Sequence, residues 1–309
     1  MLNPILSFSA TRRMRSFRTL LIAGIWLLVM LGTALLMMGN LFGTDVSFNS
    51  LRSGVSCYQL LIIVQFVLII LVAPAMTSGA IAGERERQTL ELLLVTNTRS
   101  FRIVWGKAME SFAMLALLIV CGLPVMCLTL IAGAVTLPQI LAGELFLLVM
   151  AFAAVCVGVL SSAIARSTVG SSILSYVILL AVGLLTALPL LVDPGENMVK
   201  LVYDENRLAA LPAAEALGMI SPVLFLNPGY GLLAMLQGQT GMLTSLLEYQ
   251  GDGRLLYGFK LMNRAGGETV ALICCGAVTV LALILILAAA LVLRGNGLKA
   301  ARRTKVSGL

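Results

Sequence analysis

The chain has 309 residues, of which 60% are hydrophobic and 11% are charged, and its mean hydropathy is +1.02. Soluble domains are roughly 45–50% apolar and about 25% charged, and a soluble chain of this size cannot hide so much apolar surface from water. The apolar residues form continuous runs rather than alternating with polar ones, which indicates helices and not a barrel. The composition therefore predicts an all-α integral membrane protein and excludes an ordinary soluble enzyme.

Six apolar runs are long enough to cross a bilayer, which requires about 20 helical residues. These predicted spans are residues 20–38, 58–76, 112–131, 141–164, 173–191 and 270–293. A seventh stretch, 220–237, is weaker because Pro222, Asn227 and Pro228 break or cap helices rather than extend them. We expect a short helix there instead, beginning at Pro228 and ending near Gly238, either re-entrant or lying on the surface.

The basic residues alternate in density between successive runs, which predicts the orientation of the chain. Fifteen of the 21 fall on one side: Arg12, Arg13, Arg15, Arg18, Arg85, Arg87, Arg99, Arg102, Lys107, Arg166, Arg294, Lys299, Arg302, Arg303 and Lys305. Because cytoplasmic loops carry the excess of lysine and arginine, both termini are expected in the cytoplasm. Topology and anionic lipid then explain the net charge of +7, and no nucleic-acid partner is expected.

The connection between the fifth and sixth runs, about 192–269, is the largest insert of this single transmembrane domain, 1–309. It carries eight acidic residues together with apolar patches at 208–217 and 221–236. Disordered linkers are poorer in apolar residues than this. We expect an external cap of short helices lying on the outer membrane face.

The segment after the second run has the pattern of a short amphipathic helix on the cytoplasmic side. Glu84 and Glu86 would lie in its first turn, where the helix dipole favours acidic groups. Leu90, Leu93 and Leu94 would share one face at i, i+3, i+4 spacing. Such a helix, with a charged start and a leucine face between two spans, suits docking into a groove on a soluble partner. The alternative is a solvated charge run beside the membrane.

The run APAMTSGAIAGERERQTLELLLVTNTRSFRIVWGKAM resembles the region between the second and third spans in permease subunits of bacterial type-2 ABC transporters. One departure is Asn97, which stands where a proline is common. The stretches TRRMRSFR and SPVLFLNPGYGLLAML are also similar to that family. The resemblance implies a six-span domain in the bacterial cytoplasmic membrane. That domain would pair with a second permease copy or a similar permease chain and with two ABC ATPase subunits.

The same resemblance implies that one group of residues forms the coupling helix that contacts the ATPase. They are Gly83, Glu84, Arg85, Glu86, Arg87 and Glu91. The basic stretch 12–18, with apolar neighbours, fits both a simple orientation signal and an amphipathic elbow helix on the inner membrane surface.

The chain lacks the residues that ATP hydrolysis requires. No G-x-x-x-x-G-K-[ST] loop occurs, and Gly106-Lys107 is followed by Ala108. No histidine is present, so the commonest metal ligand and general base is missing. We therefore expect no catalytic residue, metal or cofactor in this chain, with ATP and Mg bound by the partner ATPase.

One carboxylate, Glu144, falls inside a predicted span. An ionisable residue there is a functional-site hypothesis, against the alternatives of an interfacial carboxylate or a hydrogen bond to a polar neighbour. The sequence thus predicts the permease of an ATP-driven exporter, with a hydrophobic or amphipathic substrate. Two other functions stay open: a secondary transporter or channel, and a non-transporting membrane anchor or sensor.

Overall fold

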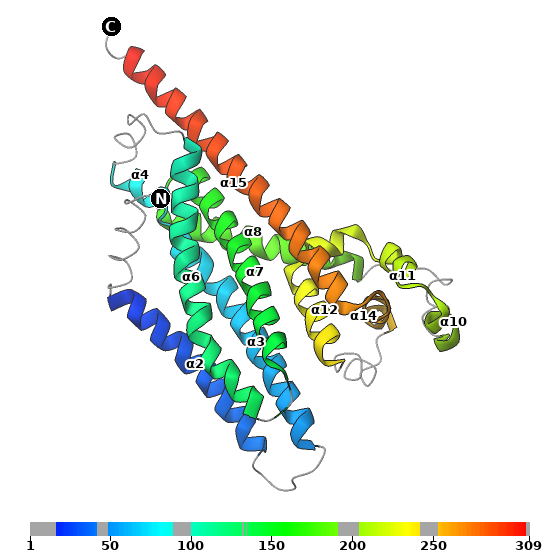
Figure 1. The fold of residues 1–309 in the computed structure, drawn as a ribbon. Helices are drawn as coiled ribbons and strands as arrows, with labels where there is room; N and C mark the ends of the chain where they lie inside the picture. The colour runs from blue at the N-terminus through cyan, green and yellow to red at the C-terminus, as the bar shows by residue number, and fades with distance from the viewer. Residues whose placement is uncertain are drawn as a thin grey trace.

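The computed structural model describes residues 17–41, 49–88, 100–131, 133, 135–190, 204–241 and 253–306, and every regular element within them is a helix. Six of these helices are long and apolar enough to span a membrane. They are α2 (Phe17–Leu41), α3 (Asn49–Thr77), α6 (Ser100–Ile131), α7 (Leu137–Ile164), α8 (Thr168–Ala187) and α15 (Gly267–Val306). Each predicted span coincides with one of them, the fifth continuing into the short η1 (Leu188–Leu190). The prediction of a helical chain with six apolar helices of membrane-spanning length is confirmed for the described residues (Figure 1).

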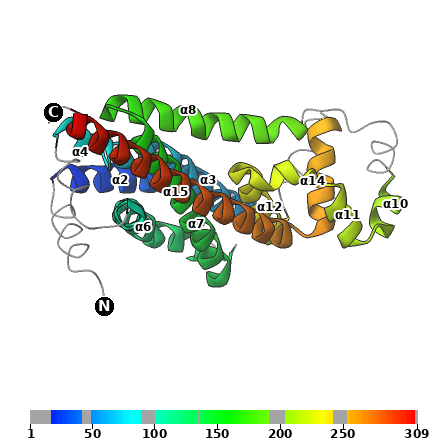
Figure 2. The same cartoon turned by 90° about the horizontal axis from the view of Figure 1, so that it is seen from above.

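Helix α7 is the centre of the bundle. It packs against α3, α6, α8 and α15, and 61% of its span is buried, against 17% for α2 and 11% for α8. Figure 2 shows α8 running along one side of the other helices. Large apolar side chains are exposed along α2 and α8, so these two helices present the surfaces suited to lipid or to another subunit.

Small residues let α3 and α7 approach closely near one end of the bundle. A Cβ atom on Gly158 would lie only 1.8 Å from Thr77 Oγ1, so no larger residue fits there. Thr77 is the last residue of α3, and the close contact fixes where the chain leaves that helix. The turn that follows is thereby placed beside the end of α7.

The insert between α8 and α15 contains the short helices that its composition predicts. They are α10 (Glu205–Ala210), α11 (Ala213–Met219), η2 (Pro222–Leu226), α12 (Pro228–Thr240) and α14 (Gly253–Ala265). Helix α12 begins at Pro228 as predicted, and the Asn227 side chain caps it by accepting from the Gly229 and Tyr230 amides. It ends at Thr240, two residues beyond the predicted end near Gly238, and Gly241, with a φ of +66°, caps it.

Helix α12 is buried against the long helices rather than exposed on their surface, which fits the re-entrant alternative for this element. Its residues are mostly buried, and it packs against α15. The two backbones nearly touch: a Cβ on Gly267 would lie 2.3 Å from the Ala234 carbonyl oxygen, and one on Gly231 would lie 2.8 Å from Cys274 Cβ. Because glycines stand at these contacts, a helix of only 13 residues can pack closely within the bundle. Helices α10, α11 and α14 instead project beyond it (Figures 1 and 2).

Part of the basic set that the charge count groups together lies toward one end of the bundle. The end of α3, the start of α6 and the α7–α8 turn lie at this end, and α15 runs on past it (Figure 1). Among the described residues, these elements and the segment after α3 carry Arg85, Arg87, Arg102, Lys107, Arg166 and Arg294. The predicted elbow helix falls on residues before Phe17 and lies outside the described residues.

Candidate functional site

The segment after α3 forms a short helix, α4 (Ala82–Glu86), preceded by a tight turn. The predicted helix does not run unbroken from Glu84 toward the leucines, because α4 ends at Glu86 and Gln88 has a φ of +58°. That conformation is incompatible with a continuing α-helix. The leucines of its predicted apolar face, Leu90, Leu93 and Leu94, lie outside the described residues. Glu91 lies outside the described residues.

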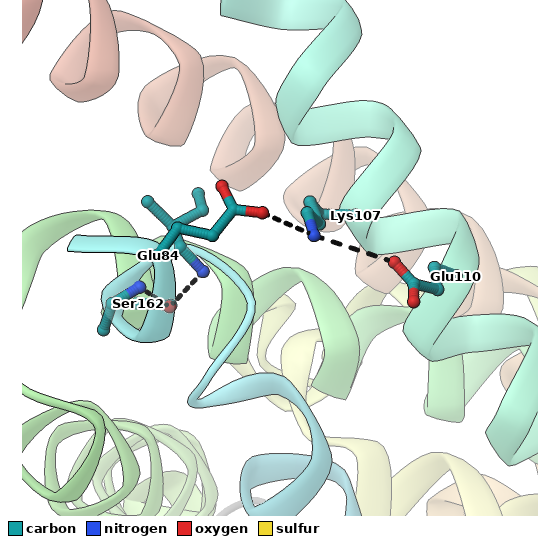
Figure 3. Close-up of polar contacts among 6 residues, drawn as sticks. Glu84, Lys107, Glu110 and Ser162 are labelled. Atoms are coloured by element: carbon teal, nitrogen blue, oxygen red, sulfur yellow. Dashed lines mark hydrogen bonds and ion pairs between the residues drawn. The ribbon is translucent and has the colours of Figure 1, made fainter. Parts of the chain in front are cut away.

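Ser162 of α7 holds the start of α4 in place (Figure 3). Its Oγ accepts hydrogen bonds from the Ile81 and Ala82 amides, each at 2.9 Å, and donates to the Ser78 carbonyl oxygen at 2.8 Å. Ser162 is fully buried. The first amides of a helix have no partner within it, so one serine hydroxyl from another helix satisfies groups that would otherwise be left without an acceptor.

Two charged side chains of α4, those of Arg85 and Glu86, bind the junction between α7 and α8. Arg85 donates to the carbonyl oxygens of Ala163 and Ala165, where α7 ends. Glu86 accepts from the Thr168 amide at 2.9 Å and from its hydroxyl. The guanidinium thus meets the negative end of one helix and the carboxylate meets the positive start of the next, as their dipoles favour.

Glu84 links the same segment to α6. Its Oε1 lies 2.7 Å from Lys107 Nζ, and the same ammonium lies 3.9 Å from Glu110 Oε2 (Figure 3). Side chains from α4 and α6 therefore share one cation. Lys107 and Glu110, three residues apart, form the pair that their spacing indicates.

The outward side of the α4 segment is polar and exposed. Glu86, Arg87 and Gln88 are exposed, whereas Ala82 is buried. Of the predicted coupling residues, Glu84, Arg85 and Glu86 have polar contacts to α6, α7 and α8, and Arg87 faces solvent. We call residues 82–88 the α4 knob. It combines a charged outer face with direct polar contacts to three long helices.

Glu144 lies deep in the bundle, two turns after α7 begins, and is 5% exposed. Its Oε2 accepts a hydrogen bond from Gln65 Nε2 of α3 at 3.0 Å. The sequence reasoning missed Gln65, which is fully buried. A glutamine inside the apolar run 58–76 is the signal that identifies it. A Cβ on Gly122 of α6 would lie 3.3 Å from that Gln65 amide nitrogen, so the amide fills the space this glycine leaves.

A polar cluster lies between Glu144 and the start of α7. Tyr58 is fully buried, and its hydroxyl donates to Gln239 Oε1 at 2.8 Å and lies 3.1 Å from the Gln139 carbonyl oxygen. Gln139 and Gln239 also exchange side-chain to backbone hydrogen bonds. Three elements, α3, α7 and α12, are joined by this cluster. The sequence reasoning did not identify it, because its members lie in three distant segments.

An apolar cavity of about 270 Å³ lies among α3, α7, α8, α12 and α15. Its walls include Phe66, Met150, Leu179 and Val278, and Asn227 is its polar margin. The Asn227 amide donates to the Gly183 carbonyl oxygen at 3.0 Å. The cavity therefore suits an apolar group.

In the described residues, no group of three or more Cys, Asp or Glu side chains is placed to hold a metal ion. A comparison with protein-family models and a search of curated proteins find no match to this chain.

Proposed function

We propose that this chain is the permease subunit of an ATP-driven ABC transporter and that a separate ATPase subunit binds the ATP and Mg. The observation that carries the proposal is the α4 knob, with exposed Glu86 and Arg87 above contacts that reach three long helices. A docking element for a motor needs an accessible face and stiff connections to the moving parts, and this segment combines the two.

The polar contacts define how motion would pass into the bundle. Displacement of the α4 knob at Arg87 would be transmitted to α7 through the hydrogen bonds of Ser162 and Arg85. It would be transmitted to α8 through Glu86 and to α6 through the Glu84–Lys107 ion pair. Packed helices shift as rigid bodies rather than deforming continuously. ATP-driven closure of the motor would therefore tilt α6, α7 and α8 together, which is the movement that alternating access requires.

The exposed apolar surfaces support the remaining parts of the proposal. Helices α2 and α8 offer faces for membrane lipid and for a second permease copy or a similar chain. The apolar cavity supports a hydrophobic or amphipathic substrate. The basic end of the bundle would face the cytoplasm of a bacterial cell, where anionic lipid attracts it, and no nucleic acid is involved.

Changing Arg87→Ala in the tagged full chain tests the proposal. We expect an ATP-hydrolysing subunit to co-purify with the wild-type chain and to be lost from the variant at equal membrane expression. Arg207→Ala is the matched control, because Arg207 is also an exposed arginine, 73% accessible, but lies in α10 of the insert. An Arg87→Ala variant that retains the ATPase, or a wild-type chain that never captures one, contradicts the proposal.

The buried Glu144 specifically favours a second candidate, an ion-coupled secondary transporter. That function predicts substrate movement by the purified chain alone in liposomes under an ion gradient, without ATP. Transport that requires a co-purified ATPase would exclude it.

A further inference from the structure

We propose that Glu144 is a proton-binding site. In the folded chain its carboxyl group carries a proton on Oε1, and this O–H donates a hydrogen bond to Gln65 Oε1. This site does not depend on the proposed permease function. It is carried by the hydrogen-bond pattern of two facing side chains in the middle of the bundle.

Two oxygen atoms of this pair are buried without a partner. Gln65 Nε2 donates to Glu144 Oε2 at 3.0 Å, whereas Gln65 Oε1 and Glu144 Oε1 have no hydrogen bond and no exposure. Both atoms are acceptors if Glu144 is a carboxylate, so neither can satisfy the other. Unsatisfied buried polar atoms are rare in folded proteins, and each calls for an explanation.

One added proton satisfies both atoms at once. A carboxylic acid and a carboxamide can form a ring of two hydrogen bonds, N–H to the carboxyl oxygen and O–H to the amide oxygen. The first of these bonds is present between Gln65 and Glu144. The second needs one donor between the two oxygens that lack a partner, and a proton on Glu144 supplies it. The step is the binding of one proton by a carboxylate, with no other reactant.

The described residues around Glu144 provide no cation to compensate a negative charge on it. No ion pair reaches it from any residue in the described part of the chain. The titratable group beside it is Tyr58 of α3, whose hydroxyl would lie 2.9 Å from a Cβ on Gly143. An isolated carboxylate in such a medium is strongly disfavoured, and the group neutralises instead. A metal cation is a poorer fit than a proton, because two oxygens fall short of the six or more that such ions commonly take.

A polar cluster lies toward the start of α7 from this site. Tyr58 of α3 joins Gln139 of α7 and Gln239 of α12, both half-buried. Gln139 precedes Glu144 by one to two turns of α7, so the start of α7 is the side of the site on which these further polar groups lie.

Infrared spectroscopy of the full chain in lipid nanodiscs at neutral pH tests the site. We expect a protonated-carboxyl stretching band in the wild type that is absent from Glu144→Gln and retained in Glu110→Gln. Glu110 is the matched control, since it is similarly buried at 8% exposure but has Lys107 beside it. A band that persists in Glu144→Gln, or a wild type with no such band, overturns the proposal.

A second variant keeps the test decisive if Glu144→Gln does not fold. In Gln65→Leu the acid loses its amide partner, so the band should move to higher frequency without disappearing. Exchanging potassium for sodium at constant ionic strength should leave the wild-type band unchanged. A band that stays in place in Gln65→Leu, or one that sodium abolishes, contradicts a proton held between these two side chains.

Discussion

The α4 knob and the Glu144–Gln65 pair are two places where this chain takes charged groups out of water, and they do so in opposite ways. At the knob, Arg85 binds two carbonyl oxygens, Glu86 binds an amide and a hydroxyl, and Glu84 binds Lys107. In the interior, the described residues give Glu144 a single donor and leave one of its oxygens without a partner. The charged groups of the knob are held by several polar contacts, whereas the Glu144–Gln65 pair lacks one hydrogen-bond donor, which a proton would supply.

The difference lies in what each region has nearby. The knob adjoins helix ends, which supply unpaired amides and carbonyls for charged side chains. Within the long helices, backbone amides and carbonyls are already paired along the helix and offer little to a charged side chain. A charged residue placed there must find a side-chain partner from another helix or become neutral.

The largest effect on stability is expected for Gln65→Leu, which removes the only hydrogen bond to Glu144 that the described residues provide. An orphaned buried acid should cost about 3 kcal/mol of unfolding free energy, seen as a lower thermal unfolding midpoint in detergent. The double variant Gln65→Leu/Glu144→Leu should recover most of this loss, because no polar group is then buried alone. A double variant as unstable as the single one would show that packing, not polarity, sets the cost.

A matched glutamine on the same helix should matter less. Gln59 donates to Thr240 Oγ1 at 2.6 Å, but that hydroxyl also donates to the Leu236 carbonyl oxygen. Thr240 therefore keeps a partner in Gln59→Leu. Equal losses for Gln59→Leu and Gln65→Leu would contradict the contrast between a satisfied and an incomplete polar pair.

Ser162→Ala should have an intermediate effect at the knob. The change leaves the Ile81 and Ala82 amides without their acceptor, which should cost about 2 kcal/mol by the same thermal unfolding measurement. Ser161 is the control: it is equally buried, but its hydroxyl donates only within its own helix, to the Val157 carbonyl oxygen. Ser161→Ala as damaging as Ser162→Ala would refute the role of Ser162 in holding α4.

Arg85→Met should have the smallest effect on stability, about 1 kcal/mol, because Arg85 is only half-buried and water can replace part of its contacts. Within the knob it should also loosen the link between α4 and the end of α7. Limited proteolysis of the α4 region should then be faster than in Arg87→Met, whose arginine is exposed. Equal cleavage rates would contradict a holding role for Arg85.

Much of the architecture follows from the sequence, because spans are set by length and hydropathy alone. The six runs and the start of α12 at Pro228 are examples, since ~20 apolar residues or a proline after an asparagine act locally. The extent of α4 did not follow. Its sequence continues in a helical pattern past Gln88, yet contacts of Arg85 and Glu86 with α7 and α8 accompany a helix that ends at Glu86.

The sequence by itself predicted the six long apolar helices that the structure contains, and it marked Glu144 as an ionisable group within one of them. Only the tertiary structure decided which side chains pair with the buried polar groups. Ser162 lies 80 residues along the chain from Ala82, and Gln65 lies 79 residues from Glu144. The placing of α12 inside the bundle likewise depends on close contacts between distant glycines and α15. Hydropathy is a local property, whereas satisfying a buried polar group depends on which helices meet.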